Sequence, residues 1–282
     1  MYTIDDTGIY SILCKKLLLA AKRGVQVVCA VDGTKNEISS ETMESIRKLG
    51  NNFVFLYYND PKKFFTNFIE NTLYKTVSRH HEKIIIVDDK VFTGSGNMKS
   101  EYGGPLLGEN IFKDIYAIVK KGPTKGIFEF MRSTVYEEER KHVPDPKFCP
   151  FYNDTMRTYK DETESFGYYF EAPNKYKEIR KKLIKMLNSA EDRIVIVQPY
   201  FQLVRSITRA FLDARRRGVK VTIITAKDKD LIVYQYIPNF LLFKKLIEEG
   251  CEVYEDTSNF LHAKLYIIDN KKFSLGNHLL NS

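Results

Sequence analysis

The sequence predicts a duplicated α/β protein, and two observations carry this prediction. A helix that ends at a glycine and runs into a strand occurs in each half, as LLLAAKRGVQVVCAV at Leu17–Val31 and FLDARRRGVKVTIIT at Phe211–Thr225. Each half then reaches a His-x-Lys, four mostly aliphatic residues and an Asp. A chain of 282 residues also lies near the length at which one hydrophobic core gives way to two. Two domains of like construction are therefore expected.

The elements of each copy follow in the same order. Gly24 and Gly218 come after basic residues that suit a helix C-terminus, where a glycine can close the helix. Gly50 and Gly250 stand again between a helical stretch and an apolar run. Each copy therefore predicts helix, strand, helix, strand before its His-x-Lys.

A proline-containing stretch separates the two copies. Residues 138–170 contain Pro144, Pro146 and Pro150 and show little periodicity, which indicates a linker or a surface excursion. Helical spacing resumes over Tyr176–Leu187, and a buried strand is expected over Arg193–Val197. We place the first half at residues 1–155 and the second at 156–282.

One apolar segment has two interpretations. Leu231–Phe243 reads LIVYQYIPNFLLF, with many aromatic and few charged residues. It is either a lipid-facing helix or a helix packed on the sheet, and the packed helix is favoured.

The formal net charge of +8 favours an anionic partner, either nucleic acid or anionic lipid, although a solvated basic surface explains the charge equally well. No apolar run reaches the roughly 18 residues that a bilayer span requires, and no signal peptide is recognised. We expect a cytoplasmic or peripherally membrane-associated protein, without a metal or another cofactor.

The two His-x-Lys motifs are the candidate catalytic residues. They comprise His81, Lys83 and Asp88 in the first half and His262, Lys264 and Asp269 in the second. Alternate residues of a strand share a face, so each His and its Lys are expected to point the same way. Two such pairs suit a phosphodiester, because one imidazole can attack phosphorus, the other can protonate the leaving oxygen, and the lysines neutralise the phosphate. One motif arises easily by chance, whereas two with identical spacing at the same place in a repeat do not.

These motifs resemble those of the phospholipase D superfamily, whose signature is H-x-K-x4-D followed shortly by G-S-x-N. Gly94-Ser95-Gly96-Asn97 matches the second part in full. The continuation to Glu101-Tyr102-Gly103 is similar to the cardiolipin synthase branch, as are Asp114 with Gly122-Pro123, the Pro199-Tyr200-Phe201 turn and Asp230. The resemblance covers nearly the whole chain.

The resemblance implies two mixed β-sheets flanked by helices, with the active site at the interface of the halves. It also implies transfer through a phosphohistidine, with His81 as nucleophile and His262 as general acid, although pseudo-symmetry makes these two roles exchangeable. Lys83 and Lys264 would bind the phosphate together with Ser95, Asn97 and Asn277. Asp88 and Asp269 would lie behind the site and orient the structure and the imidazoles.

The sequence departs from the family pattern in two respects. The second copy reads Leu275-Gly276-Asn277-His278-Leu279, so either two residues are missing before Asn277 or Asn277 occupies the Ser position. Compared with the family, an N-terminal strand and the C-terminal part of the second half are also expected to be missing. This motivates the hypothesis that the chain folds incompletely or is weakly active.

Three functions remain open at this point. The leading one is a phosphatidyltransferase or phospholipase acting on anionic glycerophospholipid at a membrane surface. The second is a metal-independent nuclease of the same superfamily, because histidine attack is indifferent to the groups attached to the phosphate. The third is a catalytically weak homologue that binds lipid or a partner.

Overall fold

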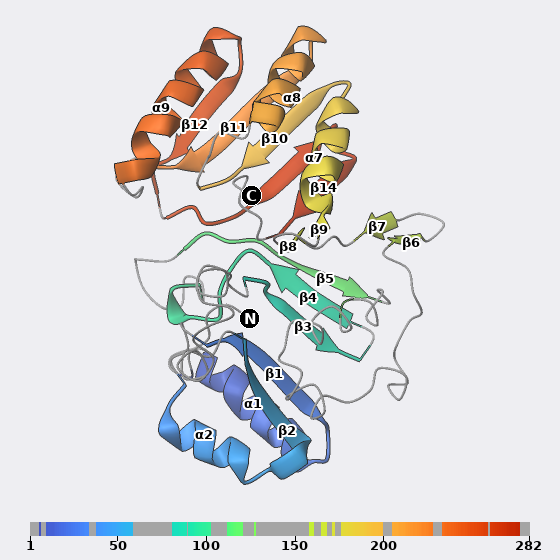
Figure 1. The fold of residues 1–282 in the computed structure, drawn as a ribbon, viewed down its shortest axis with the longest axis vertical. Helices are drawn as coiled ribbons and strands as arrows, with labels where there is room; N and C mark the ends of the chain where they lie inside the picture. The colour runs from blue at the N-terminus through green and yellow to red at the C-terminus, as the bar shows by residue number, and fades with distance from the viewer. Residues whose placement is uncertain are drawn as a thin grey trace, which may run out of the picture. The chain divides into compact units, whose positions relative to one another are not determined.

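The computed structural model describes residues 6, 10–33, 38–58, 81–88, 90–102, 112–120, 127, 158–160, 165–167, 171–172, 176–199, 205–227, 233–258 and 260–276 (Figure 1). The chain divides into two compact units. The first comprises Met1–Thr93, Asn97–Leu107 and Ile118–Tyr168. The second comprises Gly94–Gly96, Gly108–Ala117 and Tyr169–Ser282, so two short segments from the first half of the sequence belong to it.

The first unit opens with an α-β-α-β arrangement. It contains α1 (Tyr10–Lys22), β1 (Val27–Asp32), α2 (Ser40–Arg47), the 3-10 turn Gly50–Asn52 and β2 (Phe53–Tyr58). Strands β1 and β2 are parallel, in register from Val27 opposite Phe53 to Asp32 opposite Tyr58. The α2 helix is capped by Ser39, whose hydroxyl accepts the Thr42 N–H at 3.2 Å.

A second sheet follows, in the order β3-β4-β5, with β3 (Ile84–Val87), β4 (Lys90–Gly94) and β5 (Tyr116–Lys120). Strands β3 and β4 form an antiparallel hairpin, and a short 3-10 turn at Ser100–Tyr102 comes after it. The expected linker region contains one small antiparallel pair, β6 (Thr158–Lys160) with β7 (Ser165–Gly167). A second small pair, β8 (Glu171–Ala172) with β9 (Tyr176–Lys177), follows it.

The second unit is built on one five-stranded sheet in the order β12-β11-β10-β13-β14. Strands β10 (Arg193–Val197), β11 (Lys220–Ala226) and β12 (Glu252–Asp256) are parallel. Strand β13 (Leu265–Ile268) runs antiparallel to β10, and β14 (Lys272–Leu275) antiparallel to β13. The helices are α7 (Glu178–Asn188), α8 (Arg205–Arg216) and α9 (Val233–Glu248).

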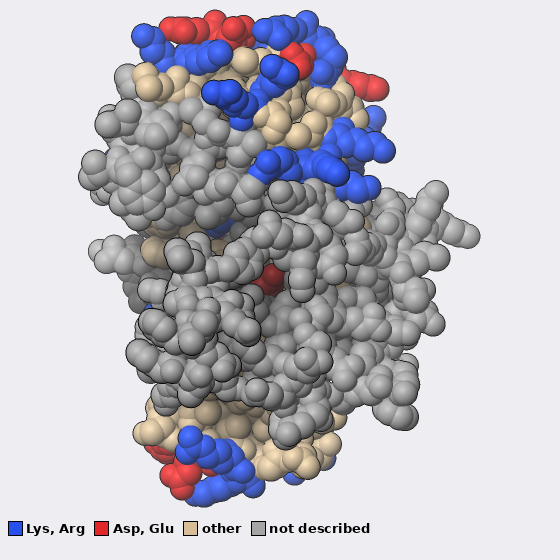
Figure 2. Space-filling view, in the orientation of Figure 1, with Lys and Arg blue, Asp and Glu red and all other residues tan. Residues whose placement is uncertain are grey.

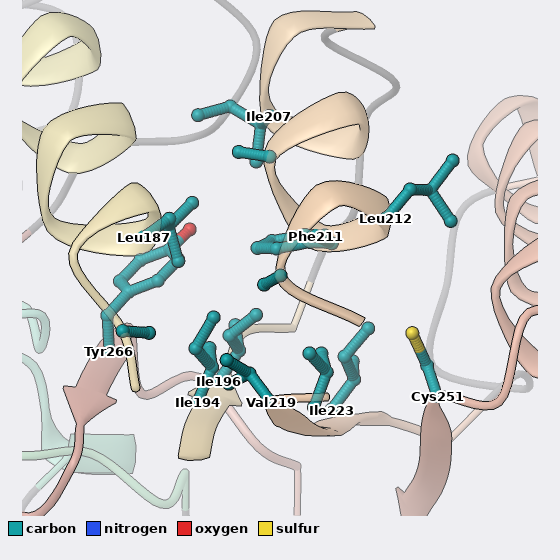
Figure 3. Packing of buried hydrophobic residues seen from close by; sticks show 14 of the residues in the cluster. Leu187, Ile194, Ile196, Ile207, Phe211, Leu212, Val219, Ile223, Cys251 and Tyr266 are labelled. Atoms are coloured by element: carbon teal, nitrogen blue, oxygen red, sulfur yellow. The ribbon is translucent and has the colours of Figure 1, made fainter. Parts of the chain in front are cut away.

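The core of this unit lies between one face of the sheet and the helices. Ile194 and Ile196 of β10 alternate along the strand, and together with Tyr266 of β13 they meet Leu187 of α7 and Phe211 of α8 (Figure 3). Each of these side chains is at most 2 % exposed, and full burial of one contributes roughly 1.5–3 kcal/mol. This packing fixes β13, the strand that follows His262.

Helix α9 belongs to the same layer, because Leu242 and Leu246 are buried in the same core. The interpretation of the apolar segment as a helix packed on the sheet is thus supported for its C-terminal part, although Leu241 is exposed. The side chains of residues 233–240 lie outside the described part of the chain.

The duplication is visible in the backbone itself. Gly24 and Gly218, at matched positions after α1 and α8, have φ of 89° and 88°, and the two motif aspartates Asp88 and Asp269 both have φ of 53°. Aspartate in the left-handed backbone conformation is uncommon, so its occurrence at the same place in both copies supports the duplication. The predicted fold class, a duplicated mixed α/β protein with helices flanking its sheets, is confirmed in these elements. Among the described residues of the first unit no strand corresponds to β10, and β1-β2 and β3-β4-β5 form separate sheets.

Candidate active site

The two His-Lys pairs have the same local geometry. Strands β3 and β13 each begin at the residue after the lysine, so the pairs lie just before the strands rather than within them. In both copies the lysine Nζ donates to the carbonyl of its own histidine at 2.8 Å, from Lys83 to His81 and from Lys264 to His262. Lys83 is 4 % exposed and Lys264 is 1 % exposed. Because buried ammonium groups are rare without a function or a partner, the pairs are strong candidates for anion binding.

His262 is held on both ring nitrogens. Its Nδ1 lies 2.7 Å from Oδ2 of Asp114, a carboxylate that is only 2 % exposed. An ionised carboxylate can only accept a hydrogen bond, so Nδ1 donates, and in the neutral ring the lone pair is on Nε2. Nζ of Lys264 lies 3.3 Å from that Nε2. The atom that would exchange a proton with a substrate is therefore defined by Asp114 and is next to a cation.

Lys264 has an unusual ionisation. Burial disfavours its ammonium form and lowers the pKa of Lys264 from 10.5 to about 8, while the charge of Asp114 opposes this change. At neutral pH the side chain still carries its charge. This charge can bind a phosphate oxygen or influence the protonation of His262.

Asp114 is in turn supported by two further donors. The Ser95 hydroxyl donates to its Oδ1, and the Ile115 N–H donates to the same oxygen at 3.1 Å. With His262 on Oδ2, three donors offset the cost of burying this carboxylate. Ser95, predicted as a phosphate ligand, thus uses its hydroxyl proton on Asp114 in this structure.

The glycines of the G-S-x-N segment permit a close backbone approach. A Cβ on Gly94 would lie 2.6 Å from the Ile115 carbonyl oxygen, and a Cβ on Gly96 would lie 2.9 Å from Oδ2 of Asp114 and overlap the Tyr116 hydroxyl. Only glycine fits these two positions without displacing the Asp114 segment. The motif therefore places Ser95 against Asp114.

Asn97 lies in the first unit. Its Nδ2 donates to the Tyr102 hydroxyl at 3.1 Å, and the residue is 9 % exposed. Tyr102 is the tyrosine of the Glu-Tyr-Gly continuation in the sequence. The hydrogen bond shows that this tyrosine orients the Asn97 amide.

The motif aspartates lie at the other end of their strands. Asp269 is seven residues beyond His262, a path of roughly 20 Å along an extended chain. Its carboxylate accepts the N–H groups of Asp192 at 2.9 Å, Arg193 at 3.0 Å and Glu191 at 3.0 Å. Burial raises the pKa of Asp269, but these backbone donors outweigh it, and the net pKa is below 3.8. Asp269 joins β13 to the turn before β10, and the imidazole of His262 is oriented by Asp114.

Strand register resolves the irregular second motif. Ile84, the residue after Lys83, pairs with Thr93, and Leu265, the residue after Lys264, pairs with Leu275. Gly276 therefore corresponds to Gly94, and the next residue, Asn277, takes the sequence position of Ser95. The second hairpin turn is one residue longer than the first, with three residues instead of two between its strands. Asn277 itself lies outside the described residues.

The predicted site residues divide between the units. Ser95, His262, Lys264 and Asp269 belong to the second unit, where the structure brings the first three together around Asp114. His81, Lys83, Asp88 and Asn97 belong to the first unit. The sequence near Asp114 resembles the family but predicts no role for this residue, because nothing there indicates a histidine 148 residues away.

Comparison with known proteins bears on this arrangement. A family described as "Cardiolipin synthase, PLD-like domain" matches residues 183–278, which include the second His-x-Lys motif. Residues 183–278 therefore form a phospholipase D-like domain. The chain is 29% identical over 282 residues to a cardiolipin synthase of Halalkalibacterium halodurans, covering 98% of this chain and 53% of the relative. It is 25% identical over 287 residues to cardiolipin synthase B of Escherichia coli K12, covering 98% and 64%.

A solved structure shares the fold of this chain. Phosphatidylserine synthase of Haemophilus influenzae Rd KW20 matches with a TM-score of 0.59 at 14% identity, covering 92% of this chain and 74% of that one. The chain spans about half to two thirds of the length of the cardiolipin synthases described above.

Proposed function

We propose that the protein transfers a phosphatidyl group by two displacements at phosphorus. Nε2 of His81 attacks the phosphorus and forms a P–N bond, while the P–O bond to the first alcohol breaks and that oxygen takes a proton from His262. An acceptor alcohol or water then gives its proton to His262 and attacks the phosphorus, and the bond to His81 breaks. The histidines return to their starting states, so no cofactor is consumed.

The His262 arrangement carries this proposal. A general acid must alternate between protonated and neutral forms at one defined nitrogen, and the Asp114 hydrogen bond leaves Nε2 as that nitrogen. Asp114 also stabilises the imidazolium form, and the ammonium of Lys264 at 3.3 Å favours release of the proton to a substrate. These opposing charges suit a residue that gives and takes a proton in one cycle.

The phosphate is bound by cations and amides in this proposal. Lys83 and Lys264 neutralise the non-bridging oxygens, with Asn97 and Asn277 as additional ligands. Ser95 can reach a phosphate only by giving up its bond to Asp114, so we assign it to the support of that carboxylate. Asp88 and Asp269 fix the strand ends behind each pair.

The proposed substrate is an anionic glycerophospholipid such as phosphatidylglycerol. The names of the relatives support this class, as does the charge of the second unit. Helices α7 and α8 carry eight Lys and Arg against one Glu and one Asp. Figure 2 shows Lys and Arg gathered over the part of the second unit that contains these two helices. In the part of the chain that the structure describes, every helix is too short or too polar to cross a bilayer. We propose that this basic face holds the protein at an anionic membrane surface.

The test is turnover of two substrates in EDTA. Purified protein is incubated with phosphatidylglycerol vesicles and, separately, with single-stranded DNA, beside the variants His81→Ala, His262→Ala and Lys220→Met. The last variant breaks an exposed Lys220–Glu252 ion pair of 3.0 Å and serves as the matched control. We expect cardiolipin or phosphatidic acid from wild type and control, and none from either histidine variant.

Other outcomes assign the alternatives. DNA cleavage that both histidine variants lose would identify the nuclease, for which the basic face is also suited. Vesicle binding without turnover of either substrate would identify a lipid-binding homologue. Turnover that survives His262→Ala would overturn the proposed role of His262.

A further inference from the structure

The Asp114 segment is attached to the His262 segment by a short parallel bridge. The Lys113 N–H donates to the Phe260 carbonyl at 2.8 Å, and the Lys113 carbonyl accepts the N–H groups of His262 and Ala263, both at 2.9 Å. Lys113 and Leu261 form the isolated bridge pair. Three hydrogen bonds around one residue thus connect two segments that are about 150 residues apart in sequence.

Alternation along this bridge sends neighbouring side chains to opposite sides. Phe112 and Asp114 both reach the imidazole of His262: the Phe112 ring stacks on it with centroids 6.0 Å apart and planes 23° apart, and Asp114 binds Nδ1 at 2.7 Å. Lys113, between them, faces away from the imidazole. A slip of one residue in this bridge would exchange the sides and direct Lys113, a cation, to the place of Asp114.

An ionic cluster holds Lys113 on its own side. Its Nζ contacts both carboxylate oxygens of Asp256, at 2.9 and 2.6 Å, and the Ser258 hydroxyl. Ser258 in turn donates its N–H at 3.0 Å and its hydroxyl at 2.6 Å to the same carboxylate. Burial raises the pKa of Asp256, but the bonds from Lys113 and Ser258 dominate and lower it below 3.8. Asp256 is the last residue of β12, so the cluster anchors the bridge to the edge of the five-stranded sheet.

We propose that the Lys113–Asp256–Ser258 cluster is a positioning device that sets the register of Phe112 and Asp114 on His262. Lys113 and Asp256 do not touch substrate; they act through Asp114. The charged groups facing the imidazole are Asp114 on one side and Lys264 on the other, with Phe112 and Phe260 as apolar neighbours. Loss of the ion pair would release Asp114 from Nδ1 without removing any group from the site.

This role is separable from that of an ordinary exposed ion pair, which contributes only about 0–1 kcal/mol and would leave catalysis unchanged. The consequences for turnover rest on the proposed function, so the test needs a second readout that is independent of turnover. The nitrogen resonances of the His262 imidazole provide it, because they report which ring nitrogen carries the proton.

The experiment compares Lys113→Met, Lys113→Arg, Asp256→Asn and the control Lys220→Met in the full chain. Misplacement of a catalytic group by about 1 Å costs up to about a hundredfold, so Lys113→Met should lower kcat about 10- to 100-fold while KM changes little. Lys113→Arg keeps the charge and should recover most of the rate. In the imidazole nitrogen spectrum, Lys113→Met and Asp256→Asn should show the Nδ1–H form giving way to a mixture of both tautomers, and Lys220→Met should not.

The outcomes distinguish the two hypotheses. An unchanged His262 spectrum and a rate equal to that of Lys220→Met would overturn the positioning role. A changed spectrum in a protein whose wild type turns over neither substrate would leave the positioning role in place and contradict the proposed function. If Lys113→Met does not fold, as judged by circular dichroism, Lys113→Arg and Asp256→Asn decide the question. The proposal would be overturned if both variants had the same His262 nitrogen spectrum as wild type.

Discussion

The buried charge of Lys264 predicts that removing this residue stabilises the protein and abolishes its activity. Lys264 is 1 % exposed, and burial lowers its pKa from 10.5 to about 8. Each pH unit of that difference corresponds to roughly 1.4 kcal/mol, so the charged form destabilises the fold by about 3 kcal/mol at neutral pH. Lys264→Met keeps the length of the side chain and loses the hydrogen bond to the His262 carbonyl, which contributes about 1 kcal/mol. The variant should therefore be about 2 kcal/mol more stable at pH 7.

The pH dependence has a definite sign. A lysine whose folded pKa lies below its unfolded pKa opposes folding fully below pH 8. This cost shrinks as pH rises from 8 to 10.5 and disappears above 10.5, where both states are neutral. The stability advantage of Lys264→Met should accordingly shrink over that interval. The measurement is urea unfolding of both proteins, followed by circular dichroism at pH 7 and near pH 10, with equal m-values required. A variant less stable than wild type at pH 7, or an advantage independent of pH, would show that the buried charge of Lys264 does not destabilise the fold.

Other variants test the glycine contact, the motif aspartate and the basic helix. Gly96→Ala should abolish activity, because its Cβ would lie 2.9 Å from Oδ2 of Asp114. An active variant with an unchanged His262 nitrogen spectrum would contradict the close approach of the Gly96 backbone to Asp114. Asp269→Asn should lower stability by about 2 kcal/mol at pH 7, because the bonds to three backbone N–H groups weaken. The pKa of Asp269 is below 3.8, so the difference should shrink below pH 3.8 and disappear as pH falls through that pKa. Urea unfolding at pH 7 and at a series of lower pH values tests this. The double variant Lys181→Glu, Lys185→Glu should reduce sedimentation with anionic vesicles about tenfold or more, since each basic residue contributes about 1 kcal/mol at such a surface. Hydrolysis of a water-soluble short-chain phospholipid should not change. Unchanged sedimentation would exclude α7 from the membrane contact.

Much of the second unit could be predicted from the sequence because its signals are local. Gly218 closes α8, the alternating Ile194 and Ile196 form a buried strand, and the residues after Lys264 form another. The duplication was equally visible, and Asp88 with Asp269 shows that it extends to backbone conformation.

The environment of His262 could not be predicted, since it depends on contacts between distant segments. Asp114 reaches the imidazole only because the bridge at Lys113 brings residues 112–114 beside residues 260–263. The place of Asn277 was ambiguous for a different reason: the extra residue is in the turn between β13 and β14, which only the strand register reveals. A motif aspartate, Asp269, looked like the natural partner of the histidine, yet the strand carries it to the opposite end of the sheet.

Identification of the covalent intermediate tests the double displacement directly. Protein mixed with phosphatidylglycerol is quenched within milliseconds at alkaline pH, where phosphohistidine survives, digested, and examined by mass spectrometry. We expect a phosphatidyl adduct on the peptide containing His81, absent from His81→Ala and formed more slowly in His262→Ala. An adduct on His262 would reverse the two roles, and turnover without any histidine adduct would contradict the double displacement.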